Sequence, residues 1–137
     1  MNKITIGYPE SAPDPRTIFE LDDQGSISLL DPATNNTYKD NIDGNCITIY
    51  NRLIKYLQSM DNGIMSFPTV LGNRILIKME IVPYGEIYTL RLKVKVKDEF
   101  FEGYVFSLDT SEYVFKVTIN DVLVQSDDNS INQTVYE

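Results

Sequence analysis

The spacing of hydrophobic positions changes once along this chain. Between residues 46 and 60 they recur at steps of three and four, whereas through most of residues 74–119 they alternate with polar positions. Steps of three and four place side chains along one side of a helix, and strict alternation places them on one face of a strand. The pattern therefore predicts one amphipathic helix followed by a series of half-buried strands.

The predicted helix covers residues 46–60, "CITIYNRLIKYLQSM". Asn45 can cap its first turn through the side-chain oxygen, and Gly63 lies just past its last turn. The polar positions Arg52, Lys55 and Gln58 fall opposite the apolar ones. A single helix with one wide apolar face is typical of a helix that covers a sheet. Its apolar positions are Cys46, Tyr50, Leu53, Leu57 and Met60.

Short turns separate the strands that follow the helix. The pair Gly72–Asn73 predicts a two-residue hairpin turn, and "PYGE" and "DTSE" supply two more turns. Consecutive strands joined in this way pair antiparallel. In the fourth of these strands, "YVFSL", the alternation predicts that Tyr104, Phe106 and Leu108 point into the core together.

Before the helix, "TIFEL" and "SISLL" flank "DDQG", which predicts a hairpin over residues 17–30. The fold class is therefore α+β. We expect a curved antiparallel β-sheet, a meander of about five or six strands, covered by one α-helix and the N-terminal hairpin. Residues 1–124 are predicted to form a single domain, and residues 125–137 a polar and flexible C-terminal tail.

The residue types leave little room for catalysis. The chain has no histidine and one cysteine, Cys46, which falls in the apolar register of the helix and is predicted to be a buried structural thiol. The segment "KDNIDGNCI" resembles the start of a calcium loop with Gly44 at the sixth position, but Lys39 and Tyr50 then occupy positions 1 and 12, where such a loop needs acids. We expect no enzyme activity, no cofactor and no metal site.

The overall charge restricts the partners. Twenty acids against twelve Lys and Arg give a formal net charge of -8, which repels nucleic acid and anionic lipid. No apolar run is long enough to cross a membrane, and residues 1–15 contain no apolar core of a signal peptide. One cysteine makes no intramolecular disulfide, so we expect a cytoplasmic protein.

One stretch departs from this acidity. In "RLKVKVK", residues 91–97, Arg or Lys occupies every second position, so the cations share one face of a strand. The stripe has two interpretations. It is either the wet face of a half-buried sheet, where Lys discourages aggregation, or a contact surface for a partner. Lys116, on a later strand, is expected to extend the same face.

The contact interpretation predicts a set of partner-binding residues that lie on the polar sheet face or in the turns beside it. They are Arg74, Lys78, Tyr84, Arg91, Lys93, Lys95, Lys97, Phe100 and Phe101. Charges on such a face steer association, and exposed aromatic side chains often anchor it.

The predicted function is therefore that of a non-catalytic protein-binding module. A small acidic chain without catalytic machinery is typical of bacterial immunity proteins, each of which neutralises a cognate toxin, and an inhibitor of this kind is the favoured interpretation. Two alternatives stay open. One is an oligonucleotide-binding β domain that uses the basic strand face, although most aromatic positions alternate out of phase with the cations. The other is a phage or structural component that assembles through its sheet edges.

Overall fold

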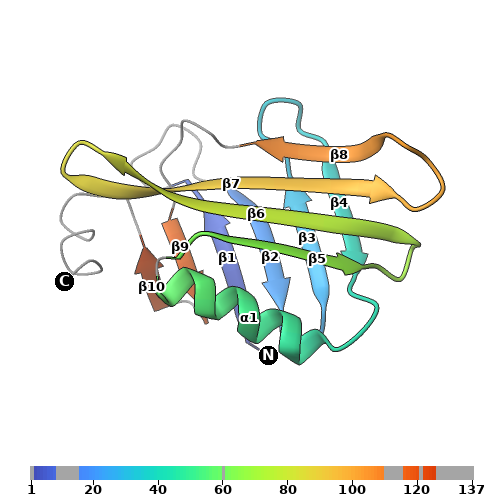
Figure 1. Ribbon diagram of the computed structural model, residues 1–137, viewed down its shortest axis with the longest axis horizontal. Coiled ribbons are helices and arrows are strands. Elements are labelled where there is room, and N and C mark those ends of the chain that lie inside the picture. The colour runs from blue at the N-terminus through green and yellow to red at the C-terminus, as the bar shows by residue number, and fades with distance from the viewer. Residues whose placement is uncertain (1, 9–15, 60, 110–115, 121, 126–137) are drawn as a thin grey trace.

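The chain folds into two layers (Figure 1). The computed structural model describes residues 2–8, 16–59, 61–109, 116–120 and 122–125. A six-stranded sheet forms one layer, and a four-stranded sheet with the helix α1 beside it forms the other. The predicted α+β class, with antiparallel sheet and a single helix, is confirmed.

The six-stranded sheet, called the large sheet, combines the N-terminal strands with two strands from the end of the described chain. Its strand order is β10-β9-β1-β2-β3-β4, and every neighbouring pair is antiparallel. The predicted hairpin is present as β2 and β3. The strands are β1 (Lys3–Gly7), β2 (Thr17–Asp22), β3 (Ser26–Leu30), β4 (Thr37–Asn41), β9 (Lys116–Ile119) and β10 (Val122–Gln125).

The four-stranded sheet, called the small sheet, is the predicted meander. Its order β5-β6-β7-β8 follows the sequence, and all pairs are antiparallel. The two central strands are long and pair along their whole length, from Asn73 opposite Asp98 to Tyr84 opposite Ile87. The strands are β5 (Gly63–Pro68), β6 (Asn73–Tyr84), β7 (Ile87–Asp98) and β8 (Tyr104–Asp109).

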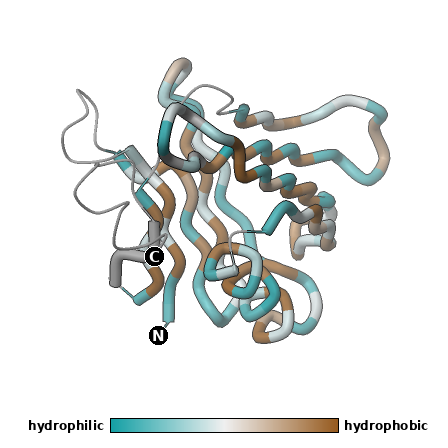
Figure 2. Tube along the Cα trace, turned by 60° about the vertical axis from the view of Figure 1, so that its left-hand side comes forward, coloured by the Kyte–Doolittle hydropathy of each residue, from teal (hydrophilic) through white to brown (hydrophobic). Residues whose placement is uncertain are grey.

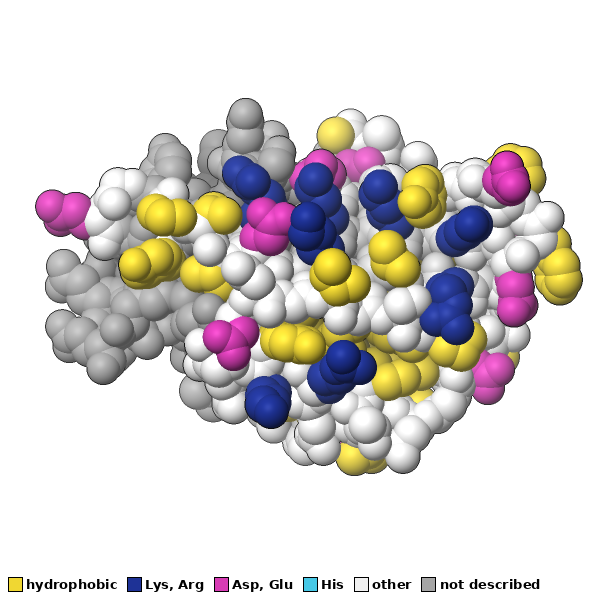
Figure 3. All heavy atoms as spheres, in the orientation of Figure 1, with side chains coloured by type: hydrophobic (Ala, Val, Ile, Leu, Met, Phe, Trp, Pro, Cys, Tyr) yellow, Lys and Arg dark blue, Asp and Glu magenta, His cyan; other side chains and the backbone are white. Residues whose placement is uncertain are grey.

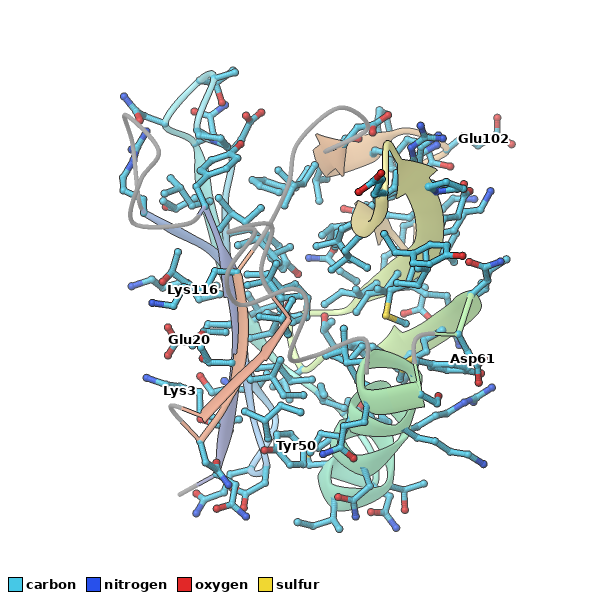
Figure 4. The ribbon with its side chains drawn as sticks, turned by 90° about the vertical axis from the view of Figure 1, so that its left-hand side faces the viewer. Lys3, Glu20, Tyr50, Asp61, Glu102 and Lys116 are labelled. Carbon is cyan, nitrogen blue, oxygen red and sulfur yellow. The ribbon has the colours of Figure 1, made fainter. Side chains whose placement is uncertain are left out.

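The predicted single sheet is thus divided into two. Both the N-terminal hairpin and the meander have one apolar face, and each face needs a cover. The hairpin obtains more strands by pairing with β1 and β4, and the resulting large sheet covers the apolar face of the small sheet (Figure 4). Sequence periodicity reports which side of a strand is buried but not which strands share a sheet.

Helix α1 (Cys46–Ser59) lies beside β5 and faces the large sheet (Figures 1 and 4). Asn45 Oδ1 accepts a hydrogen bond from the Thr48 amide at 3.1 Å, so the predicted N-cap is confirmed. Tyr50, Leu53 and Leu57 are its buried residues. The expected packing of this helix on the meander is replaced by packing on the large sheet, next to the meander.

The core lies between the layers. Hydrophobic positions alternate along the strands of both sheets and meet in the interior (Figure 2). Ile4, Ile6 and Phe19 of the large sheet and Ile77 and Val94 of the small sheet are completely buried. Among the described residues, the buried hydrophobic side chains form one cluster. The single domain over residues 1–124 stays a prediction, and the predicted tail lies outside the described residues from residue 126 on.

The turn between β5 and β6 differs from the predicted one. The Gly72 amide donates a hydrogen bond to the Thr69 carbonyl at 3.1 Å, so Val70 and Leu71 occupy the centre of the turn and Gly72 follows it. The φ of Gly72 is 85°, a left-handed conformation that glycine adopts easily. The predicted Gly72–Asn73 centre is therefore wrong. This geometry is a three-residue hairpin loop, in which glycine supplies the bulge after the turn.

Cys46 is half-buried rather than fully buried. Its thiol lies against the turn between β2 and β3, where a Cβ on Gly25 would come 2.5 Å from Cys46 Sγ. This close contact gives Cys46 a structural role, because it packs the first turn of the helix against the turn between β2 and β3. Within the described part of the chain, no helix has the length and hydrophobicity needed to span a membrane.

Candidate interaction surface

The outer face of the small sheet gathers cations from its two long strands. Six of the twelve Lys and Arg residues of the chain lie there, because β6 and β7 pair in register and the residues between the cations, such as Val94, point into the core. We call this surface the cationic face. It consists of Arg74, Lys78, Arg91, Lys93, Lys95 and Lys97.

Like charges lie directly opposite each other on the cationic face. The register of β6 and β7 pairs Arg74 with Lys97 and Lys78 with Lys93. Like-charged cross-strand pairs destabilise an antiparallel sheet. Arg74 donates a hydrogen bond to Ser66 Oγ at 2.8 Å, but this neutral partner leaves its charge in place. Among the described residues, no ion pair offsets the charges of Arg74 and Lys97, so this cross-strand pair carries electrostatic repulsion.

Two acids offset part of this positive charge. Glu80 Oε1 lies 2.8 Å from Lys78 Nζ, and Glu80 Oε2 lies 3.7 Å from Arg91 Nη1. The hydrogen bond from Lys78 and the nearby positive charges lower the pKa of Glu80, so this carboxylate stays ionised. Asp109 lies 3.8 Å from Lys93. Two acids against six cations leave the face positive.

Apolar side chains are interspersed with these cations. Leu76, opposite Lys95 in the register, is 41% exposed, and Ile64, opposite Lys78, is 60% exposed. These aliphatic groups would give a partner apolar surface to bury next to the charges that it contacts.

Tyr104 also lies on this outer face, although alternation predicts it in the core. The register shifts between Val96 and Lys97, so Tyr104 lies opposite Lys97 while Phe106 lies opposite Val96. This β-bulge inserts Val105 and turns Tyr104 to the other side of the sheet. Lys95 Nζ lies 4.7 Å from the centre of the Tyr104 ring. The run of three consecutive apolar residues, "YVF", is the sequence signal that marks the break in alternation.

The helix extends the positive surface. Arg52 and Lys55 are exposed, and their positions on α1 are opposite the buried Tyr50, Leu53 and Leu57. Because that buried side faces the large sheet, the two cations point the same way as the cationic face. Figure 3 shows Lys and Arg side chains over both the small sheet and the helix.

Lys116 does not belong to this surface. It lies on β9 and points away from the small sheet, as do Lys3 and Glu20 (Figure 4). The expectation that it extends the stripe is therefore wrong, because β9 pairs with β1 in the large sheet. On that opposite surface Lys3 Nζ lies 3.3 Å from Glu20 Oε1.

The exposed aromatic residues of the predicted site lie at one end of the small sheet. Phe100 and Phe101, in the turn between β7 and β8, are 92% and 62% exposed. The turn between β5 and β6 lies at the same end, since Asn73 pairs with Asp98, and it exposes two aliphatic residues that the sequence analysis missed. We call Val70, Leu71, Phe100 and Phe101 the apolar tip. The predicted Tyr84 belongs to β6 at the far end of the sheet, and its side chain is outside the described part.

Buried polar groups hold the Val70–Leu71 turn in place. The Asp40 carboxylate, almost fully buried, accepts hydrogen bonds from the Leu71 amide at 3.3 Å and the Tyr38 hydroxyl at 2.5 Å. Asn73 Nδ2 donates to the Tyr38 oxygen at 2.8 Å. These contacts join β4 of the large sheet to the first hairpin of the small sheet, and we call Tyr38, Asp40, Thr69 and Asn73 the polar junction.

The polar junction keeps Asp40 ionised. Burial alone would raise the pKa of Asp40, but hydrogen bonds from Tyr38, Thr69 and the amides of Asn41 and Leu71 together hold it below its ordinary value. Burial and the hydrogen bond to Asp40 raise the pKa of Tyr38, which remains a neutral donor. A charged acceptor with several donors makes a firm connection between the two sheets.

The described residues contain no group of three His, Cys, Asp or Glu side chains suited to a metal ion. A cleft of about 610 Å³ opens between β8 and the loop before β4. Asp31, which lines it, accepts a hydrogen bond from the Ala33 amide at 3.0 Å and so shapes its own loop. The cleft brings together no acid pair for general acid–base chemistry.

No family model, curated protein or solved structure matches this chain. The cationic face and the apolar tip are therefore interpreted from their own chemistry.

Proposed function

We propose that the protein is a non-catalytic protein-binding module that contacts an acidic partner through the cationic face. The observation that carries this proposal is the pairing of Arg74 with Lys97 on a face of six cations that also exposes Leu76. An acidic partner would relieve the repulsion and cover the apolar groups in one contact. On a face that served only solubility, cross-strand pairs of opposite charge would stabilise the sheet more than pairs of like charge.

Among such modules we favour an inhibitor of the immunity type, which neutralises a cognate protein such as a toxin. The chain is small and acidic, and it lacks histidine, which suits a role based on binding alone. We place this role in the cytoplasm because the lone Cys46 makes no intramolecular disulfide.

An oligonucleotide-binding function is the second candidate, and Tyr104 is the observation that favours it. An exposed aromatic ring among cations can stack on a base. Lys95 already lies over this ring, however, and the neighbouring apolar residues Ile64 and Leu76 are aliphatic and offer no stacking surface. The net charge of -8 also opposes the approach of a phosphate backbone.

The experiment compares two charge reversals with the parent protein. Lys93→Glu/Lys95→Glu changes the cationic face. Lys3→Glu/Lys39→Glu makes the same change in net charge on the outer face of the large sheet, where Lys39 is exposed opposite Ser28. Each immobilised protein is exposed to lysate of its source cell, and bound proteins are quantified by mass spectrometry.

We expect a partner that the parent and the large-sheet variant retain and the cationic-face variant loses. Equal capture by all three proteins would contradict the proposal. Fluorescence anisotropy with a single-stranded DNA or RNA oligonucleotide runs alongside. Salt-sensitive binding of the oligonucleotide that only the cationic-face variant loses would instead favour the second candidate.

A further inference from the structure

The apolar tip is a second surface that exposes hydrophobic side chains to solvent. It presents four large hydrophobic side chains at the ends of two adjacent hairpins, and Phe100 is 92% exposed. Acids accompany it in the same turn, with Asp98 and Glu99 before the phenylalanines and Glu102 after them. Figure 3 shows hydrophobic and acidic side chains together at this end of the small sheet. The tip is therefore apolar with an acidic rim.

Hydrogen bonds fix the backbone of the apolar tip. The Leu71 amide is hydrogen-bonded to Asp40, and the Val70 amide donates to the Asn41 carbonyl at 2.8 Å. In the other turn the Phe100 amide donates to Asp98 Oδ1 at 2.8 Å. Fixed backbones keep the hydrophobic side chains outside the core, and a preorganised surface loses less entropy on binding.

The tip and the cationic face are complementary. The tip offers hydrophobic groups with an acidic rim, and the face offers Ile64 and Leu76 surrounded by cations. They cannot meet within one molecule. The tip extends along the strand direction at the end of the small sheet, whereas the face looks out perpendicular to the same sheet.

We propose that the apolar tip of one molecule docks on the cationic face of a second copy of this chain. This inference rests on the proposed role of the cationic face as a protein-contact surface and names one partner for it. The tip phenylalanines lie on Ile64 and Leu76, and the acidic rim, including Glu99, approaches the cations of β7. Burial of the hydrophobic groups supplies affinity, and the charges set the orientation.

Such a contact uses two different patches and is therefore heterologous. Each molecule in a pair keeps one unused tip and one unused face, so further copies can add head to tail unless the rotation closes a ring. Repulsion between molecules of net charge -8 opposes this growth and is screened by salt, whereas salt also weakens the contact itself. Association is expected to be moderate and concentration-dependent.

The test uses sedimentation velocity on the whole chain over a dilution series. The tip variant is Phe100→Ser/Phe101→Ser, and the face variant is Lys93→Glu/Lys95→Glu. Tyr88→Ser is the matched control, because it removes an exposed aromatic at the opposite end of the small sheet. All the altered side chains lie at least partly in solvent, and near-ultraviolet circular dichroism verifies that each variant is folded.

The parent and the Tyr88→Ser control are expected to associate equally. The tip and face variants should each associate at least about tenfold more weakly. An equimolar mixture of the two variants should form a discrete heterodimer, because the tip variant retains an intact face and the face variant retains an intact tip. Its growth stops at two molecules, since the surfaces left over are the altered ones.

A parent that stays monomeric throughout the series would overturn the inference, and so would association that the tip variant keeps. A mixture that forms no heterodimer would exclude the tip-to-face geometry. A monomeric parent whose tip binds neutral phosphatidylcholine vesicles would also overturn it and assign the tip to lipid. None of these results decides the proposed function, which fails only if the cationic-face reversal leaves capture of other proteins unchanged.

Discussion

The outer faces of the two sheets differ in how far their charged and polar groups are paired with neighbouring groups. On the large sheet, Lys3 forms an ion pair with Glu20, and the hydroxyls of Thr5 and Thr118 are hydrogen-bonded across neighbouring strands. On the small sheet, Glu80 and Asp109 form ion pairs with three of the six cations, but Arg74 lies opposite Lys97 and aliphatic side chains are left exposed. A face whose groups satisfy one another needs only water. A face that leaves repulsion and apolar surface in place is better completed by another molecule.

The two outer faces keep their contrast only while both sheets pack on one core, and the largest effect on that core is expected at the helix. Leu53→Ala should lower the free energy of unfolding by about 2 to 5 kcal/mol, since Leu53 is completely buried and its loss leaves a cavity. Urea denaturation followed by circular dichroism measures the change. Ile47→Ala is the control, because Ile47 is exposed on the same helix. Equal midpoints for the two variants would mean that α1 contributes nothing to the core.

The polar junction is the next place to separate the two sheets. Asp40→Ala should cost about 1 to 3 kcal/mol, because it leaves the Leu71 amide and the Tyr38 hydroxyl without their buried acceptor. Hydrogen exchange at Leu71 should accelerate more than exchange in the strands of the large sheet. Asp43→Ala changes an exposed acid nearby and serves as control. Unchanged hydrogen exchange at the Leu71 amide would show that the turn keeps its structure without Asp40.

Acid should weaken the same junction. The folded protein holds the pKa of Asp40 below its ordinary value of 3.8, so the unfolded chain takes up a proton on Asp40 at a higher pH than the folded chain does. The stabilisation is complete above the unfolded pKa and is lost as the pH falls through the folded one. Urea midpoints of the parent and Asp40→Asn should therefore converge as the pH drops below about 4. A constant difference between them down to low pH would contradict this assignment.

The smallest expected effect concerns the two outer faces themselves. The same Lys→Glu substitution should raise the free energy of unfolding on one face and lower it on the other. Lys97→Glu places an acid opposite Arg74 and should stabilise the protein by about 0.2 to 1 kcal/mol. Lys3→Glu replaces an attraction to Glu20 by repulsion and should destabilise it by up to about 1 kcal/mol. Thermal unfolding at low salt measures both. Shifts of the same sign would mean that the cationic face is no more repulsive than the face of the large sheet.

Local pattern predicted the elements better than their arrangement. The spacing of Tyr50, Leu53 and Leu57 was enough for the helix, and the alternation of residues 90–97 was enough to place four cations on one side of β7. These features depend on a few neighbouring residues, which the sequence displays directly. The division into two sheets depends on pairing between distant strands, which periodicity does not report.

Contacts between distant segments also decided where single residues of the candidate site lie. Tyr104 reached the outer face because a bulge at Val105 shifted the register, and Leu71 reached the tip because Asp40, from another sheet, holds its amide. Contrary to the sequence prediction, Lys116 does not extend the cationic face, because its strand pairs with β1. Each of these outcomes is decided by a contact with a remote segment, so the residue types alone could not have settled them.

The position of β1 has a consequence for the time course of folding. This strand pairs on one side with β9, and its Thr5 meets Thr118 across 113 positions of the chain. During synthesis, one edge of β1 must therefore stay open until these intervening residues have been added and β9 is available. Pairings this distant close slowly, on the order of milliseconds to seconds in sheet proteins, and an open edge invites pairing with other chains meanwhile. We therefore expect the highest risk of pairing with other chains before β9 is synthesised, when that edge of β1 is unpaired.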